Sequence, residues 1–311
     1  MILPEADGEW IHVVGADGQG ITRLGGPGPA SPDSEAARGT FRALSDLARL
    51  PDGRLLASDR SSSSLTAFTA ALEPAGTIRV PGAAGVYAIR PLPDGRLVAA
   101  VRPRNPVTGG QVVVFAPGDS GPGFLPPDPL FEHNRWEAAA SPSIEVWRAD
   151  RILAYWAPLP WARVLSPEGD SLGVIGRMSE LYRGPSSGPR PRAPLESVQR
   201  WFDSFTPLVA VESVGDLLVF EYRASTRERG RGVGRAAEPD SGAAATRPEP
   251  QPGQMFLNVY SPSGGTVARD LLLPPGSRLL RSDDRRRLYL LTRSSPRELE
   301  IEIWEPRSGA S

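Results

Sequence analysis

Side chains that could bind a ligand or a metal ion occur close together in one short stretch, FEHNRWE, residues 131–137. Glu132, His133 and Glu137 are residue types that bind metal ions. Trp136 offers a flat apolar ring with a polar N–H, which suits a ring-shaped or sugar-like ligand, and Arg135 adds a positive charge. We take Glu132, His133, Arg135 and Trp136 as candidate ligand-binding residues and assign no catalytic residue.

The chain also contains seven tryptophans. Trp147 and Trp156 fall on predicted strands, where large rings fill the space between sheets. Trp201 falls in a predicted loop, as Trp136 does, so it joins the candidate ligand-binding residues. His12, the other of the two histidines, lies on a predicted strand, and we expect it to pack rather than to bind a metal.

Composition excludes several kinds of chemistry. The 311 residues include no cysteine, which rules out disulfides, thiolate metal sites and cysteine nucleophiles. None of the 35 basic residues is lysine, which removes Schiff-base chemistry and the P-loop lysine. A net charge of −1 points to neither nucleic acid nor an anionic membrane surface. No apolar run is long enough to predict a membrane-spanning helix.

The elements that would position these residues are repeated along the chain. LPDGRLLASD, residues 50–59, returns 42 residues later as LPDGRLVAAV, residues 92–101. A period of this size is typical of repeat units that cannot bury an apolar face alone. Looser copies begin at Ala149, Val214 and Asp283. A second phrase, an apolar residue and then a turn with Pro or Ala and Gly, occurs six times, ending at Gly18, Gly76, Asp119, Gly169, Gly264 and Gly309.

Each period is interpreted as four short strands. In the first full copy they are residues 44–50, 54–58, 65–69 and 77–80, which are rich in Leu, Ile, Val, Phe and Thr. Asp52-Gly53 and Asp94-Gly95 predict tight hairpin turns between a first and a second strand, because glycine accepts a positive φ without strain.

The predicted fold class is all-β, a β-propeller of four-stranded antiparallel blades. Six third strands against five second strands favour six blades, the N-terminal one incomplete. ADGEWIHVV, from Ala6, also fits a second strand that follows an Asp7-Gly8 turn. That alternative register gives five blades.

LSDLARLPDGRLLASDRSSSSLTAF, residues 44–68, resembles the NHL-type repeat of bacterial six-bladed propellers in the TolB-like superfamily. The family has Asn in the loop after Asp59, where this chain has Ser61 to Ser64. The likeness is good over residues 11–115 and faint afterwards. It implies a toroid of four-stranded blades but no single activity, since such propellers are binding platforms, lactonases and lyases alike.

One branch of this resemblance is enzymatic. Gluconolactonase-like propellers hold a divalent cation such as calcium with carboxylate and amide side chains of the inner strands. The resemblance implies Asp46, Glu145 and Asp203 as the metal ligands of this alternative, although Ala88 occupies the position that repeats Asp46. No Ser-His-Asp arrangement is evident. Amidating-lyase propellers depend on cysteines, which this chain lacks.

Loop lengths indicate which face of the propeller is functional. Strands alternate in direction within a blade, so second-to-third and fourth-to-first connections share a face. All the long connections belong to these two kinds, and they are residues 26–42, 103–110, 126–142, 177–205 and 223–254. Because binding residues concentrate on loops of a rigid scaffold, we predict that ligands bind this face.

We expect one domain over residues 1–311, with two unusual insertions. Residues 223–253 are rich in Gly, Ala, Pro and charge and have little to bury, which predicts disorder. Residues 183–194 form a Pro- and Arg-rich loop that suits an extended polyproline conformation.

The sequence therefore predicts a noncatalytic binding propeller, monomeric and without a cofactor, that binds a protein, peptide or glycan on the long-loop face. The alternative is a metal-dependent hydrolase or lactonase. The first residues show no signal peptide, which indicates the cytoplasm. If a leader is missing, the family resemblance implies a periplasmic or extracytoplasmic location.

Overall fold

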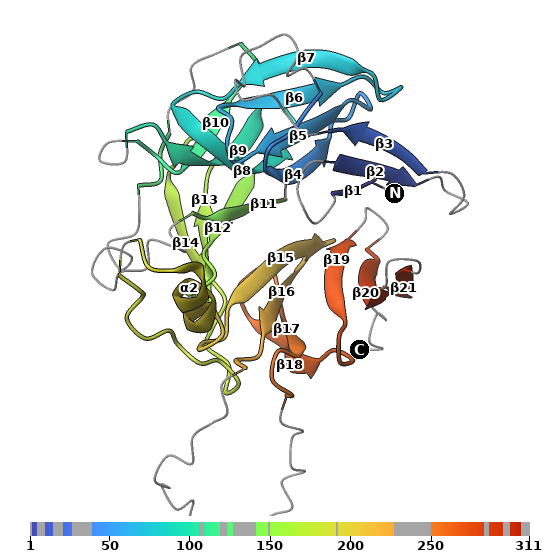
Figure 1. Cartoon of the computed structure of the whole chain (residues 1–311). Helices are drawn as coiled ribbons and strands as arrows, with labels where there is room; N and C mark the ends of the chain where they lie inside the picture. The colour runs from blue at the N-terminus through green and yellow to red at the C-terminus, as the bar shows by residue number, and fades with distance from the viewer. Residues whose placement is uncertain are drawn as a thin grey trace, which may run out of the picture. The chain divides into compact units, whose positions relative to one another are not determined.

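The computed structural model describes residues 2–4, 10–14, 21–26, 39–105, 109–118, 123–126, 141–148, 150–190, 192–226, 250–282, 286–294 and 299–305. These residues form six antiparallel sheets and one short α-helix (Figure 1). No helix among them is long and apolar enough to cross a membrane.

The strands follow one another in simple order. The first sheet contains β1 (Ile2–Pro4), β2 (Trp10–Val14) and β3 (Ile21–Gly25). The second and third are β4 (Leu44–Arg49), β5 (Leu55–Asp59), β6 (Ser64–Phe68) and β7 (Pro74–Arg79), then β8 (Ala83–Pro91), β9 (Leu97–Pro103) and β10 (Val112–Phe115). The fourth is β11 (Ser143–Trp147), β12 (Arg151–Tyr155), β13 (Ala162–Leu165) and β14 (Ser171–Ile175). After α2 (Leu195–Phe202) come β15 (Leu208–Val214), β16 (Leu217–Arg223), β17 (Met255–Tyr260) and β18 (Thr266–Leu272), and finally β19 (Arg278–Ser282), β20 (Leu288–Ser294) and β21 (Leu299–Trp304).

Five of these sheets are propeller blades. Each contains one of the five copies of the second strand that the sequence predicts, namely β5, β9, β12, β16 and β20. The sheet β1–β3 precedes them and contains none of these five copies. The third-strand phrase that ends at Gly18 lies largely outside the described residues. The all-β propeller of four-stranded antiparallel blades is confirmed. The predicted number of blades is corrected from six to five, the number that the alternative register gives.

The two LPDGR segments form the predicted hairpin turns, one between β4 and β5 and one between β8 and β9. Gly53 has a φ of 86° and Gly95 a φ of 88°, values that glycine adopts without strain. In the first turn the Leu50 amide donates to the Arg54 carbonyl at 2.8 Å. The Asp52 carboxylate accepts hydrogen bonds from the Arg54 amide and Nε at 3.1 and 2.7 Å. The Asp-Gly interpretation is therefore confirmed at both turns.

Position within a blade determines how much of a strand is buried. The second strands β5, β9 and β16 have buried residues on both faces, which explains their nearly continuous apolar sequences. The outermost strands β7 and β18 instead alternate exposed and half-buried residues. Polar side chains on the inner strands of a blade are therefore shielded from water, whereas those on the outermost strand are in contact with it.

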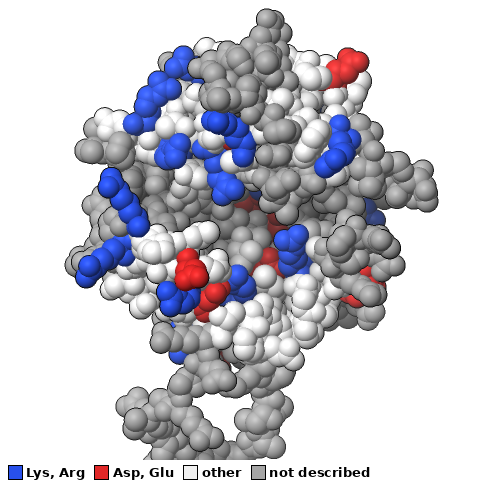
Figure 2. All heavy atoms as spheres, viewed as in Figure 1, with Lys and Arg blue, Asp and Glu red and all other residues white. Residues whose placement is uncertain are grey.

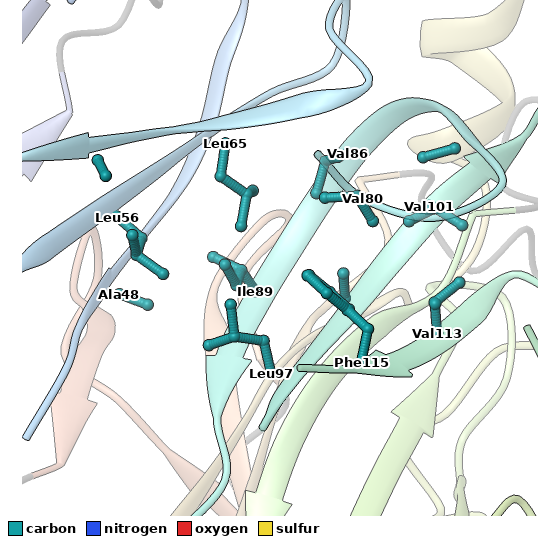
Figure 3. Close-up of a cluster of buried hydrophobic side chains, with 13 residues drawn as sticks. Ala48, Leu56, Leu65, Val80, Val86, Ile89, Leu97, Val101, Val113 and Phe115 are labelled. Atoms are coloured by element: carbon teal, nitrogen blue, oxygen red, sulfur yellow. The ribbon is translucent and has the colours of Figure 1, made fainter. Parts of the chain in front are cut away.

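The chain forms two compact units. Unit 1 comprises residues 1–129, 140–155 and 163–173, and unit 2 comprises residues 130–139, 156–162 and 174–311. In unit 1 a core cluster joins sheets β4–β7 and β8–β10, where Leu56, Leu65, Ile89 and Leu97 point toward one another (Figure 3). In unit 2 a cluster that includes Val219, Leu257 and Leu290 joins sheets β15–β18 and β19–β21.

Candidate functional site

Four of the predicted ligand-binding residues cannot be placed. Glu132, His133, Arg135 and Trp136 lie outside the described residues. Their role remains a prediction.

Two of the predicted metal ligands meet at an arginine that the sequence analysis did not single out. Asp46 on β4 and Glu145 on β11 lie on either side of β8, the inner strand of the sheet between them. The Arg90 guanidinium on β8 donates to Asp46 Oδ2 at 2.5 Å and to Glu145 Oε2 at 2.8 Å. The side chains of Arg90, Asp46 and Glu145 are 26%, 22% and 13% exposed. The three inner strands are thus joined by one partly buried ion-pair network.

Both oxygens of the Asp46 carboxylate already accept hydrogen bonds from the protein. Asp46 Oδ2 also accepts the Ile89 amide at 2.9 Å, and Asp46 Oδ1 accepts the Leu47 amide at 2.9 Å. Burial disfavours the charged form of Arg90, but the attraction of the Asp46 and Glu145 carboxylates outweighs it and raises the arginine pKa above its ordinary value. A guanidinium that stays charged therefore offsets one of the two negative charges and competes with a divalent cation for both carboxylates.

The third predicted metal ligand, Asp203, belongs to unit 2, whereas Asp46 and Glu145 belong to unit 1. Its carboxylate accepts the Gln199 side-chain amide at 3.0 Å and lies 3.4 Å from Arg223. Among the described residues no group of three or more His, Cys, Asp or Glu side chains is arranged to hold a metal ion.

The backbone of Asp203 instead joins two long connections. Its carbonyl accepts hydrogen bonds from the Thr226 amide, the Thr226 hydroxyl and the Ser225 hydroxyl, each at 3.1 Å. Residues 177–207 connect a fourth strand to the next first strand, and residues 223–226 begin a second-to-third connection. The two kinds of long connection meet here, as the sequence predicts for one face. We call residues 177–207 and 223–226 the loop platform.

Trp201 anchors this platform from the inside, so its predicted place on the surface is corrected. The ring is only 6% exposed, and its Nε1 donates to the Ser186 carbonyl at 3.1 Å. Its centroid lies 5.0 Å from those of Phe202 and Phe205. A short helix is stabilised mainly by tertiary packing of its apolar face, and Trp201 is the buried residue of α2. The strand tryptophans Trp147 and Trp156 are buried, as predicted.

The outer side of the platform is mixed in character. Leu195, the first residue of α2, is 82% exposed, and Met178 is 64% exposed. Arg190, Arg192 and Arg200 are exposed as well. In the view of Figure 2, the arginines of the described residues are spread out and do not gather in one continuous patch.

Sequence reasoning also missed a buried acid, Glu221 on β16. The residue is 1% exposed, and its Oε1 accepts the Leu279 amide of β19 at 2.5 Å. Burial raises the pKa of Glu221 to about 7. One signal was available for each missed residue. Glu221 interrupts the apolar run LLVFEY, and Arg90 lies two residues after Ala88, which places it on the face of the strand that repeats Asp46.

Comparisons with known proteins show the fold alone. No family model and no curated protein matches this chain. Among solved structures, a member of the DUF4221 family from Bacteroides vulgatus is 8% identical, with 96% of this chain and 86% of that chain covered and a TM-score of 0.55. A putative exported protein from Bacteroides fragilis is 12% identical, with 92% and 74% covered and a TM-score of 0.51. Virginiamycin B lyase from Staphylococcus aureus is 12% identical, with 99% and 84% covered and a TM-score of 0.49.

Proposed function

We propose that this protein is a noncatalytic binding propeller and that its loop platform binds a protein or peptide. The observation that carries the proposal is the set of three hydrogen bonds to the Asp203 carbonyl, which fixes two long connections against each other. Long loops fixed on a rigid scaffold are typical of binding surfaces.

The platform is held in place before any partner arrives. The Arg183 amide donates to Thr206 Oγ1 at 3.0 Å, and the Thr206 amide donates to the Arg183 carbonyl at 2.9 Å. The Tyr182 hydroxyl donates to the Pro158 carbonyl at 2.6 Å. A preorganised surface has less conformational entropy to lose on binding, which favours affinity.

The exposed side chains favour a protein or peptide as the partner. Leu195 and Met178 supply apolar area, and Arg190 and Arg200 supply planar cations with several donors. Methionine and arginine are enriched in protein interfaces. The inner strands support the noncatalytic part of the proposal, since Asp46 and Glu145 are both paired with the Arg90 guanidinium.

Labelled protein applied to peptide and glycan arrays tests this function. We compare the wild type with Leu195→Asp, which places a charge on the platform. Leu172→Asp is the matched control, since Leu172 is also an exposed leucine, 50% accessible, but lies on β14. We expect peptides that bind the wild type and the control and that lose about tenfold or more in affinity with Leu195→Asp.

Three results would overturn the proposal. In the first, no peptide binds the wild type, and in the second, Leu195→Asp binds every peptide as well as the control does. In the third, the protein hydrolyses a lactone in a metal-dependent reaction that Asp46→Asn abolishes. Binding to glycans alone would contradict the proposed class of partner.

A further inference from the structure

The outer edge of sheet β4–β7 has the geometry of a peptide-binding strand. Among the strands that the structure describes, β7 is the last of this sheet and pairs with β6 alone (Figure 1). Antiparallel pairs alternate between residues that exchange backbone hydrogen bonds and residues that do not. Two observations show which backbone groups of β7 point away from β6. They are the register of the two strands and one hydrogen bond made just after the end of β7.

The Val80 amide donates to the Ser63 carbonyl at 2.9 Å, so residue 80 belongs to a hydrogen-bonded pair. Bonded and non-bonded pairs alternate along the register, so residue 78 also exchanges backbone hydrogen bonds with β6. Thr77 and Arg79 face β6 residues in the non-bonded pairs. The backbone N–H and C=O groups of Thr77 and Arg79 therefore point away from β6. They form a short unpaired edge.

A groove of about 660 Å³ runs along this edge, entirely within unit 1. It is lined by Thr77, Ile78, Arg79, Pro81, Gly82, Pro117 and Gly118. A Cβ atom built on Gly82 or on Gly118 would meet no atom within 4 Å. The two glycines thus leave the space that another backbone needs for a close approach.

The charge in the groove comes from Arg79, which is exposed. Within the part of the chain that the structure describes, its guanidinium has no hydrogen-bond or ion-pair partner. A carboxylate complements a guanidinium in charge and in planar geometry. An occupant with an acidic side chain opposite Arg79 therefore fits this groove best.

We propose that the β7 groove binds an extended acidic peptide of a partner protein, which adds a strand to the outer edge of sheet β4–β7. Backbone bonds to Thr77 and Arg79 give affinity, and a glutamate or aspartate on Arg79 gives specificity. Pro74 and Pro81 limit the edge at both ends, so it suits a short peptide better than the long edge of another sheet. This site is independent of the loop platform.

Fluorescence anisotropy with designed probes tests the proposal. The first probe is a labelled peptide of alternating threonine and valine with one central glutamate, and the second replaces that glutamate by glutamine. Two further probes carry N-methyl groups at every second residue, on one strand edge or on the other. We expect the glutamate peptide to bind about tenfold more tightly than the glutamine peptide, and one of the N-methylated peptides to lose binding.

Variants of the protein assign the binding to β7. Arg79→Gln removes the charge, and Thr77→Pro removes an outward N–H that β6 does not use. Arg269→Gln is the matched control, because Arg269 is also an exposed arginine on an outermost strand, β18. We expect Arg79→Gln to bind the two unmethylated peptides equally, Thr77→Pro to lose binding, and the control to behave as the wild type. If Thr77→Pro does not fold, the N-methylated probes test the same backbone bonds in the wild-type protein.

The proposal is overturned if neither unmethylated peptide binds, if both bind equally well to the wild type, or if both N-methylated peptides bind as tightly as the parent. A concentration-dependent dimer that Arg79→Gln dissociates would assign the edge to a second copy of this chain and would also overturn it. Leu195 belongs to the loop platform and Arg79 to β7. The array experiment with Leu195→Asp therefore tests the proposed function, the anisotropy experiment tests the β7 groove, and either can fail while the other succeeds.

Discussion

At the scale of single residues, Arg90 is the side chain on which the inner strands of unit 1 depend. It bonds to carboxylates on two neighbouring strands, and all three side chains are largely withdrawn from water. Removing one member of a buried ion-pair network leaves the others without compensation, and the cost exceeds the value of the pair itself.

Replacing Arg90 by methionine keeps an unbranched apolar stem and removes the guanidinium and its charge. We expect Arg90→Met to lower the free energy of unfolding by about 2 kcal/mol or more, measured by urea denaturation. Arg54→Met is the control, since Arg54 pairs with Asp52 where both side chains are about half exposed, and we expect no measurable change. Equal loss in the two variants would mean that the Arg90 network does not stabilise the fold.

Glu221 predicts a pH dependence of opposite sign to that of most carboxylates. Burial raises its pKa from the ordinary 4.5 to about 7 in the folded protein. A folded state that holds its proton more tightly is stabilised at low pH and loses this contribution as the pH rises from about 4.5 through 7. The stability lost by the time the group is fully ionised amounts to about 3 kcal/mol.

Glu221→Gln keeps the shape and an oxygen that can accept the Leu279 amide, but it has no charge. We expect the variant to match the wild type near pH 5 and to exceed it in unfolding free energy near pH 8. Urea denaturation at the two pH values measures the difference. A wild type that is at least as stable as the variant at pH 8 would refute the assignment.

At the scale of elements, the two LPDGR turns allow a matched comparison. Both glycines have a positive φ, so alanine at either position costs about 1 kcal/mol of backbone strain. A Cβ on Gly53 would also lie 3.2 Å from the Ala70 Cβ, whereas a Cβ on Gly95 would meet nothing within 4 Å. We therefore expect Gly53→Ala to destabilise more than Gly95→Ala in thermal unfolding. If Gly95→Ala destabilised the protein more than Gly53→Ala, the close approach of the new Cβ to Ala70 would not determine the cost of the substitution.

The loop platform depends on Trp201. Truncating it to alanine removes the buried ring and the hydrogen bond to Ser186, so α2 loses its anchor. We expect trypsin to cut after the exposed Arg192 and Arg200 several-fold faster in Trp201→Ala than in the wild type, as followed by mass spectrometry. Leu195→Ala changes only an exposed side chain and serves as the control. Unchanged cleavage in Trp201→Ala would mean that other contacts hold the platform.

At the scale of the whole molecule, local patterns could be predicted and contacts between blades could not. The Asp-Gly turns and the second strands depend on residues close in sequence, and the predicted strand at residues 54–58 is β5, Leu55–Asp59. Arg90, by contrast, bonds to residues 44 and 55 positions away. Those partners depend on which inner strands become neighbours, which the period alone does not specify.

The blade count failed for a related reason. A third-strand phrase requires only a hairpin, so the phrase at the N-terminus was counted as a blade although its sheet lacks the LPDGR-like second strand. Trp201 was placed on the surface because its loop is polar. Its burial follows from the fold of residues 177–207 around α2, which composition does not reveal.

The central claim, that the inner strands of unit 1 serve structure and not metal-dependent catalysis, is tested most directly by thermal unfolding in millimolar calcium and in excess chelator. A ligand at a hundredfold excess over its Kd stabilises a protein by about 2.7 kcal/mol, which raises the melting temperature by several degrees. Because the Arg90 guanidinium already pairs with Asp46 and with Glu145, we expect the same melting temperature in both solutions. A rise in calcium that disappears in Asp46→Asn or Glu145→Gln would contradict the account.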